Sequence, residues 1–282
     1  MEIPNYYLIY GKYILASKDA MNGILCEPYQ EVTMKNKTIS SRKLVTSAML
    51  GAITIVLSLT PLGLIPLGFI NATTMHIPVI IGAIAEGPVV GALVGLIFGV
   101  SSLLNALLRN PSPVSFVFYN PLISVLPRIL IGITSYYAYK ASLKINDNKL
   151  KDLAKVLWAA ISLALVYLLV KNIKAGKSTT NIIFVVILLL VVVGLFIYSK
   201  KSSKGDFPIA IGAFVGSMTN TILVLGGIYL IYAEEYVKTL GIPLESARSA
   251  ILGVTITSGI PEAILSVILS TAVIKALKSS RR

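Results

Sequence analysis

The chain has very little of what proteins use for metal and redox chemistry. Its 282 residues include one cysteine, Cys26, and one histidine, His76. One thiol can form neither an intramolecular disulfide nor a thiolate metal cluster, and one imidazole cannot form a multi-histidine metal site. We therefore expect no metal centre and no cofactor.

Charged residues are also scarce. They make up 13% of the sequence, against 55% hydrophobic residues and a mean hydropathy of +0.82, whereas soluble domains carry about a quarter charged residues. The net charge of +13 would suit a nucleic-acid partner, but the lysines gather at the ends of apolar segments. The positive-inside rule places them there in membrane proteins. The sequence therefore predicts a lipid bilayer, not nucleic acid, as its surroundings.

Catalytic motifs are missing as well. The segment Ala175–Thr179 reads AGKST, like the end of a phosphate-binding loop, but the first glycine of that motif would fall at Lys171 and no strand precedes it. His76 is the single histidine, and no paired catalytic set emerges around it. We expect no enzyme activity, and no ATP hydrolysis by the chain itself.

Long apolar segments predict an all-α, polytopic membrane protein. A helix needs about 20 apolar residues to cross a bilayer. Lysine clusters at 140–155, 200–204 and 275–282 place both termini in the cytoplasm. We expect spans at 43–60, 75–86 with its flanks, 88–108, 119–139, 154–170, 179–199, 207–232 and 249–274.

Glycine recurs every fourth residue around the third of these segments, at Gly87, Gly91, Gly95 and Gly99. Residues spaced by four share one face of a helix. A row of small residues lets two membrane helices approach closely. We therefore expect this helix at the centre of a bundle.

Residues 1–33 and the two apolar segments within 150–200 differ from the other six predicted spans. Residues 1–33 are polar and rich in tyrosine, and Met34, followed by basic residues, is a second candidate start of translation. The apolar segments within 150–200 are rich in leucine, valine and isoleucine, which is typical of lipid-facing helices. The predicted organisation is a tail at 1–33 and a membrane domain at 34–282. That domain has six helices and a peripheral two-helix transmembrane hairpin at 150–200.

Arg128 and Glu262 are the most unusual residues within the apolar segments. Arg128 lies about 13 Å into its span, near the middle of a hydrocarbon core about 30 Å thick. A charge there costs several kcal/mol unless it is paired or hydrated (~2.5 kcal/mol or more). The two residues either pair with each other and join two helices, or Arg128 binds a carboxylate or phosphate of a ligand.

Other polar residues are expected in the outer half of the bundle. Buried amides must find hydrogen-bond partners, either on other helices or on a ligand in a polar pocket. The apolar loop Thr60–Thr74 either covers such a pocket as a lid or rests among lipid headgroups. Aromatic residues near it are explained equally by ligand stacking and by a membrane-interface belt. The candidate substrate-binding residues are Asn71, Thr74, His76, Asn105, Tyr119, Asn120, Arg128, Asn220 and Glu262.

Ala48 and Ala52 place small side chains one turn apart in the first span. They either pack inside the bundle or form a docking face for another membrane protein.

Four stretches resemble a known family. They are ATTMHIPVIIGAIAEGP at 72–88, NPLISVLPRIL at 120–130, LGGIYLIY at 225–232 and SGIPEAI at 258–264. They resemble the substrate-binding (S) components of energy-coupling factor (ECF) vitamin transporters, and among these the riboflavin- and pantothenate-type members. The resemblance extends over about 35–150 and 205–280. The tail and the 150–200 hairpin depart from the usual six-helix pattern.

The resemblance implies a six-helix bundle that binds a vitamin at its outer face, beneath the loop after the first helix. It also implies partners, namely a transmembrane coupling protein and two cytoplasmic ATPases. The family's Ala-xxx-Ala docking motif falls on Ala48 and Ala52. The expected function is the high-affinity binding subunit of an ECF-type ABC importer in the cell membrane. The alternative is a stand-alone secondary transporter or channel that uses Arg128 and Glu262 as a charge pair.

Overall fold

The computed structural model divides the chain into two units, residues 1–39 and residues 40–282. In the first unit, β1 (Leu8–Tyr10) pairs antiparallel with β2 (Tyr13–Leu15). Met34 and the rest of the predicted tail lie outside the described residues, so the start of translation stays a prediction. The described residues are 8–10, 13–15, 41–60, 63–66, 71–109, 113–174, 179–201, 206–241, 243, 245 and 247–280.

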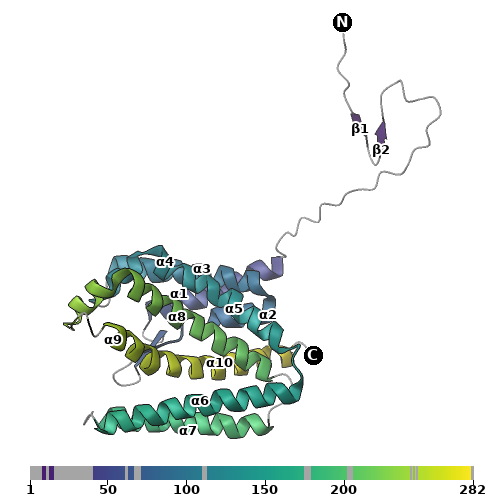
Figure 1. The fold of residues 1–282 in the computed structure, drawn as a ribbon. Coiled ribbons are helices and arrows are strands. Elements are labelled where there is room, and N and C mark those ends of the chain that lie inside the picture. The colour runs from purple at the N-terminus through teal and green to yellow at the C-terminus, as the bar shows by residue number, and fades with distance from the viewer. Residues whose placement is uncertain are drawn as a thin grey trace. The chain divides into compact units, whose positions relative to one another are not determined.

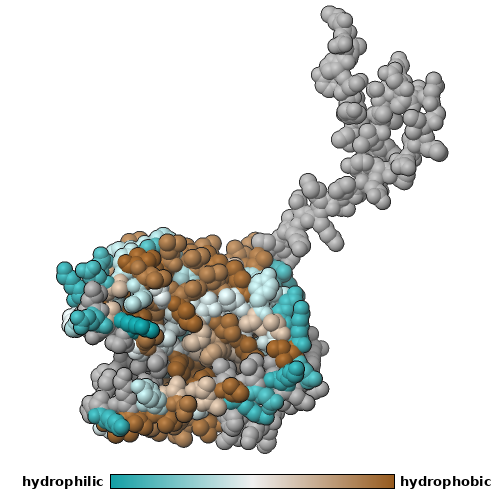
Figure 2. Space-filling model, viewed as in Figure 1, coloured by the Kyte–Doolittle hydropathy of each residue, from teal (hydrophilic) through white to brown (hydrophobic). Residues whose placement is uncertain are grey.

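The second unit confirms the prediction of an all-α polytopic fold (Figure 1). Helices form in all eight apolar segments, and in the described residues five stretches are long and apolar enough to cross a membrane. Figure 2 shows apolar surface across the middle of one face and hydrophilic residues gathered at its two ends, as a bilayer requires. The helices are α1 (Ser41–Leu59), α2 (Ile77–Glu86), α3 (Pro88–Arg109), α4 (Pro121–Ser124), α5 (Leu126–Ser142), α6 (Asp147–Lys174), α7 (Thr179–Lys201), α8 (Asp206–Thr239), α9 (Ala247–Val254) and α10 (Ile260–Ser280).

α2 alone is too short to cross, so the flanks included in the second predicted span must complete the crossing; Glu86 at its end lies 3.6 Å from Arg42 at the start of α1. The 10 residues of α2 rise about 15 Å, half the thickness of a hydrocarbon core. Most of its residues are buried, as expected of a helix that is apolar on all sides. The chain reaches it through β3 (Leu64–Pro66) and β4 (Asn71–Thr73), which pair antiparallel. Non-helical backbone at membrane depth requires surrounding protein or a water-filled cavity, and β4 leads directly into such a cavity.

The glycine row packs α3 against α5, as the sequence predicts. A Cβ atom on Gly91 would lie 2.9 Å from the Cα of Gly132, and one on Gly99 would lie 2.6 Å from the Cα of Val125. Both distances are shorter than ordinary van der Waals contact, so the two backbones touch where these glycines lie. Gly87 has a different role from the one predicted. It ends α2 with φ +109°, a conformation that favours glycine, and so turns the chain into α3.

Two predicted spans contain breaks near the same end of the bundle. Val125 separates the short α4 from α5, which begins with Leu126 and Pro127. A π-helix, Thr255–Gly259, separates α9 from α10. Pro261 follows it, and proline has no N–H for a regular helical bond and clashes with the preceding turn. Such π segments occur frequently at functional sites.

α6 and α7 lie side by side and run antiparallel (Figure 1). α6 also contacts α8, and Trp158, Ile161 and Leu165 of α6 join the hydrophobic core. Other apolar residues of the pair, such as Leu163 and Leu190, are strongly exposed. The pair therefore packs on the bundle through one narrow side. Its crossing of the membrane as a peripheral hairpin remains a prediction.

Candidate functional site

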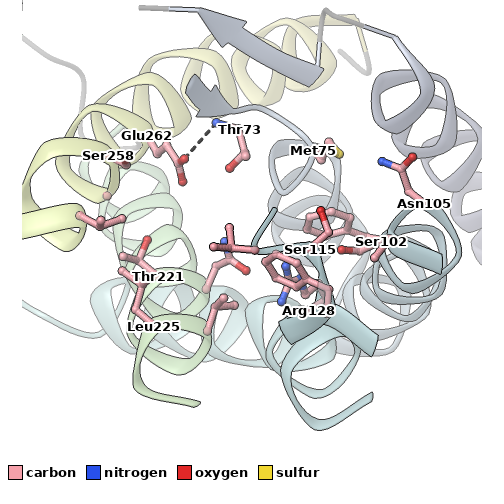
Figure 3. Close-up of a pocket in the computed structure, with 18 residues that line it drawn as sticks. Thr73, Met75, Ser102, Asn105, Ser115, Arg128, Thr221, Leu225, Ser258 and Glu262 are labelled. Atoms are coloured by element: carbon pink, nitrogen blue, oxygen red, sulfur yellow. Dashed lines mark hydrogen bonds between the residues drawn. The ribbon is translucent and has the colours of Figure 1, made fainter. Parts of the chain in front are cut away.

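A cavity of about 400 Å³ lies where α9, α10 and six other parts of the bundle meet (Figure 3). This volume falls within the range of about 300–1,000 Å³ that is typical of small-molecule sites. β4, α3, α5, α8, the π-helix and a 3₁₀ turn (Ser115–Tyr119) contribute to its wall. The lining residues are Thr73, Met75, Phe98, Ser102, Asn105, Ala106, Val114, Ser115, Phe118, Arg128, Asn220, Thr221, Val224, Leu225, Val254, Ser258, Gly259 and Glu262.

Arg128 is held rigidly in the cavity wall. It lies in the first turn of α5, directly after the break at Val125, and is 5% exposed. Its guanidinium lies 5.4 Å from the ring centre of Phe98 and 5.3 Å from that of Phe118, within cation–π distance of both. One terminal nitrogen donates a hydrogen bond to the carbonyl of Ile123.

The guanidinium of Arg128 is incompletely paired. Among the described residues its Nε atom has no hydrogen-bond partner. An arginine fork has five N–H donors and binds carboxylate or phosphate through two parallel bonds. A buried donor edge in a cavity wall therefore provides a site for an anionic group.

Glu262 lies across the cavity from Arg128, next to Ser258 and Thr73 (Figure 3). It is buried in the first turn of α10, where the helix dipole favours a negative charge. Its Oε1 accepts a hydrogen bond of 3.0 Å from the backbone N–H of Thr73. This bond ties the end of β4 to α10. The C-terminal end of the loop at 60–74 therefore reaches the cavity, as a lid would.

No ion pair joins Arg128 to Glu262 in the described part of the chain, although each affects the other electrostatically. The described structure thus gives no support to the interpretation in which the two residues only join helices. It places a cation and a carboxylate on opposite walls of one cavity. A polar molecule with an acidic group at one end and hydroxyl or amide donors at the other would match both walls.

Amides and hydroxyls also line the cavity. Asn105 of α3 and Asn220 of α8 both line the cavity. The Oδ1 atoms of both are buried and, among the described residues, have no hydrogen-bond partner. Leaving a buried acceptor unpaired costs about 1–3 kcal/mol. The two Oδ1 atoms are therefore suited to accept hydrogen bonds from the hydroxyl or amide groups of a bound molecule.

Four of the predicted site residues, Asn105, Arg128, Asn220 and Glu262, line the cavity together. Their role in binding stays a prediction. The side chain of Asn71 lies outside the part of the chain whose side chains are described.

The other four predicted residues do not line the cavity, for local reasons. Asn120 caps α4, because its Oδ1 accepts a hydrogen bond from the Leu122 N–H. Tyr119 is 41% exposed. The backbone N–H of Thr74 donates to the Gly63 carbonyl and so fixes the loop. His76 is fully buried at the start of α2, and neither of its ring nitrogens has a partner among the described residues.

Sequence reasoning missed the lining residues that are small or apolar. Phe98 and Ser102 precede Asn105 by seven and three residues, and such positions share one helix face. Ser258 likewise precedes Glu262 by one turn. These lining residues could therefore have been identified from their helical spacing to a predicted polar residue. No local signal predicted that Phe98 and Phe118 would both contact Arg128.

Ala48 and Ala52 are both exposed on α1. The buried face of this helix is formed by other small residues, Ser47, Gly51 and Thr54. The interpretation in which the two alanines pack inside the bundle is therefore wrong. Docking of a partner on this face stays a prediction.

Two comparisons place this bundle among known proteins. A family model described as "ECF transporter, substrate-specific component" matches residues 42–175. The chain is also 28% identical, over 227 residues, to the pantothenic acid transporter PanT of Lactococcus lactis subsp. cremoris (strain MG1363); the match covers 75% of this chain and 80% of PanT. Both findings agree with the helical membrane fold. Both findings support the expectation that the chain is a substrate-specific (S) component of an ECF transporter.

Proposed function

We propose that the chain captures a small, carboxylate-bearing vitamin of the pantothenate type in the cavity between Arg128 and Glu262. The buried, incompletely paired guanidinium of Arg128 is the observation that carries this proposal. The name of the relative PanT supports the same substrate class. Pantothenate has a carboxylate at one end, hydroxyls at the other and an amide between them. These groups match the cation, the carboxylate and the amides of the cavity wall.

The aromatic residues favour pantothenate over riboflavin. A flat ring system such as that of riboflavin binds well when it stacks on an exposed aromatic face. The rings of Phe98 and Phe118 lie instead against the guanidinium of Arg128. The polar groups around the cavity are better suited to a flexible, hydroxylated acid.

Titration calorimetry with the purified protein tests the proposal. Pantothenate should bind more tightly than pantothenol, in which a primary alcohol replaces the carboxylate. Loss of one charged hydrogen bond costs about 1.5–3 kcal/mol, or roughly ten- to a hundredfold in affinity. In Arg128→Lys the planar fork is lost while the charge stays, so this preference for pantothenate should shrink.

A matched control separates recognition from folding. Lys238→Gln removes a charge from the exposed end of α8, away from the cavity, and should leave both affinities unchanged. If Arg128→Lys weakens pantothenate and pantothenol equally, Arg128 supports the fold and does not read the carboxylate. Tight riboflavin binding without pantothenate binding would contradict the proposed substrate.

We further propose that both termini are cytoplasmic, that the cavity opens outward, and that energy comes from a coupling protein and two ATPases. The lysine-rich ends support this topology. In a Cys26→Ser background, Thr239→Cys should react with an impermeant maleimide in intact cells, whereas Ser279→Cys should not. Purification of a tagged chain should recover the ATPases. Uptake by the chain alone in vesicles would instead favour a stand-alone carrier. That alternative relies on Arg128 and Glu262 as a charge pair, and no ion pair joins them in the described residues.

A further inference from the structure

A second hollow lies on the membrane-facing side of α8 and α9. Its volume is about 310 Å³, and its lining residues are Ile222, Leu225, Gly226, Tyr229, Arg248, Ile251, Leu252 and Thr255. The four lining residues from α8 are spaced i, i+3, i+4 and i+7, and so are three residues of α9 together with Thr255 of the π-helix, so each side of the hollow is one continuous face. Each face is about 10 Å long. The hollow is therefore a straight groove between two helices and not an irregular dent.

The groove is apolar along its length and basic at one end. Ile222 and Leu252 on its flanks are 60% and 52% exposed, as residues facing lipid would be. α9 follows α8 through a short connection and runs back along it. Arg248 and Tyr229 therefore mark the end of the groove nearest the aqueous phase, while Ile222 and Thr255 mark the deep end. Arginine and tyrosine are suited to the headgroup level of a membrane.

Arg248 is exposed and has no carboxylate partner among the described residues. A guanidinium at the mouth of an apolar groove complements a molecule with a phosphate head and a hydrocarbon tail. We propose that this groove binds one acyl chain of an anionic phospholipid, whose phosphate is held by Arg248.

The groove and the cavity share a wall. Leu225 lines both of them. Thr255, at the start of the π-helix, lines the groove, whereas Ser258 and Gly259, at its end, line the cavity. A lipid chain in the groove would therefore support the π-helix from the side opposite the cavity. This site does not depend on which vitamin the cavity accepts.

Native mass spectrometry of the protein released from bilayers of phosphatidylcholine with phosphatidylglycerol tests the inference. The parent should retain one phosphatidylglycerol in preference to phosphatidylcholine. Arg248→Gln should weaken this retention roughly tenfold, the effect of losing one charged contact. Lys238→Gln removes an equal charge from the same end of the bundle and should retain the lipid like the parent.

A second pair of variants tests the groove itself. A Cβ on Gly226 or on Gly253 would meet no heavy atom within 4 Å, so both positions admit a side chain at its first atom, and thermal unfolding checks that Gly226→Leu and Gly253→Leu fold. The first fills the groove and should abolish phosphatidylglycerol retention, while the second lies outside it and should not. Retention that is unchanged in both Arg248→Gln and Gly226→Leu would overturn the inference. Loss of a dimer in Gly226→Leu, without a change in lipid, would show that a second copy occupies the groove.

Discussion

Gly95→Ala should disturb the cavity through the backbone of Arg128. A Cβ atom at Gly95 would lie 2.8 Å from the carbonyl carbon of Arg128 and 3.1 Å from the Cα of Ile129, whereas ordinary contact begins at 3.4 Å. Both obstacles lie in the backbone of α5, so no side chain can rotate out of the way. α3 and α5 must move apart, and Arg128 moves with α5.

The magnitude follows from two opposing terms. Overpacking a close helix contact costs about 1–3 kcal/mol. Replacing glycine by alanine inside a helix stabilises the folded protein by about 0.5–1 kcal/mol. Gly95→Ala should therefore lower stability by up to about 2.5 kcal/mol. Pantothenate affinity should fall as well, because the guanidinium is displaced from its position between Phe98 and Phe118.

Thermal unfolding in detergent and titration calorimetry measure the two effects. Gly194→Ala is the first control, since nothing lies within 4 Å of the added atom, and it should be neutral or slightly stabilising. Gly91→Ala is the second control, because its Cβ would meet Ala83 and Gly132 one turn away from Arg128. If Gly95→Ala reduces affinity no more than Gly91→Ala does, displacement of Arg128 is not the cause. A Gly95→Ala protein clearly more stable than the parent would refute the hard contact itself.

Three further predictions concern the aromatic clamp, the docking face and the hairpin. Phe118→Leu should weaken pantothenate binding more than pantothenol binding, and Phe118→Tyr should restore the difference, because the ring orients the guanidinium; equal losses in calorimetry would argue against this. Ala48→Trp with Ala52→Trp should abolish uptake by cells while leaving pantothenate binding intact, since both side chains are exposed; loss of binding would contradict a docking role. Deletion of Lys151 to Lys200 with a Gly/Ser bridge should keep affinity within a few-fold, because no described residue of the hairpin lines the cavity; a folded protein that no longer binds would disprove it.

The local character of the residues accounts for what sequence reasoning predicted correctly. Apolar segments form helices wherever they occur, because every backbone group in lipid must be paired within its own segment. The spacing of Gly91, Gly95 and Gly99 predicted one packed face for the same reason, since helical periodicity is fixed. Arg128 and Glu262 were conspicuous because a charge in an apolar segment is costly.

Tertiary structure decided how these parts combine. Asn105, Asn120 and Asn220 carry the same side chain, yet Asn120 caps a helix while the other two face the cavity. Asn120 stands directly before Pro121, which is a sequence signal for a helix start, whereas only the folded chain shows that the other two face one cavity. Likewise, α2 ends after 10 residues because β4 brings the chain to its start within the bundle.

The sequence by itself therefore determined a multi-helix membrane protein with two costly charges inside it. The tertiary structure decided that these charges face each other across a cavity rather than pair. It did so through contacts between residues far apart in the chain, such as Thr73 with Glu262 and Phe98 with Arg128. Such contacts depend on the packing of whole helices, which local propensity and hydropathy do not encode.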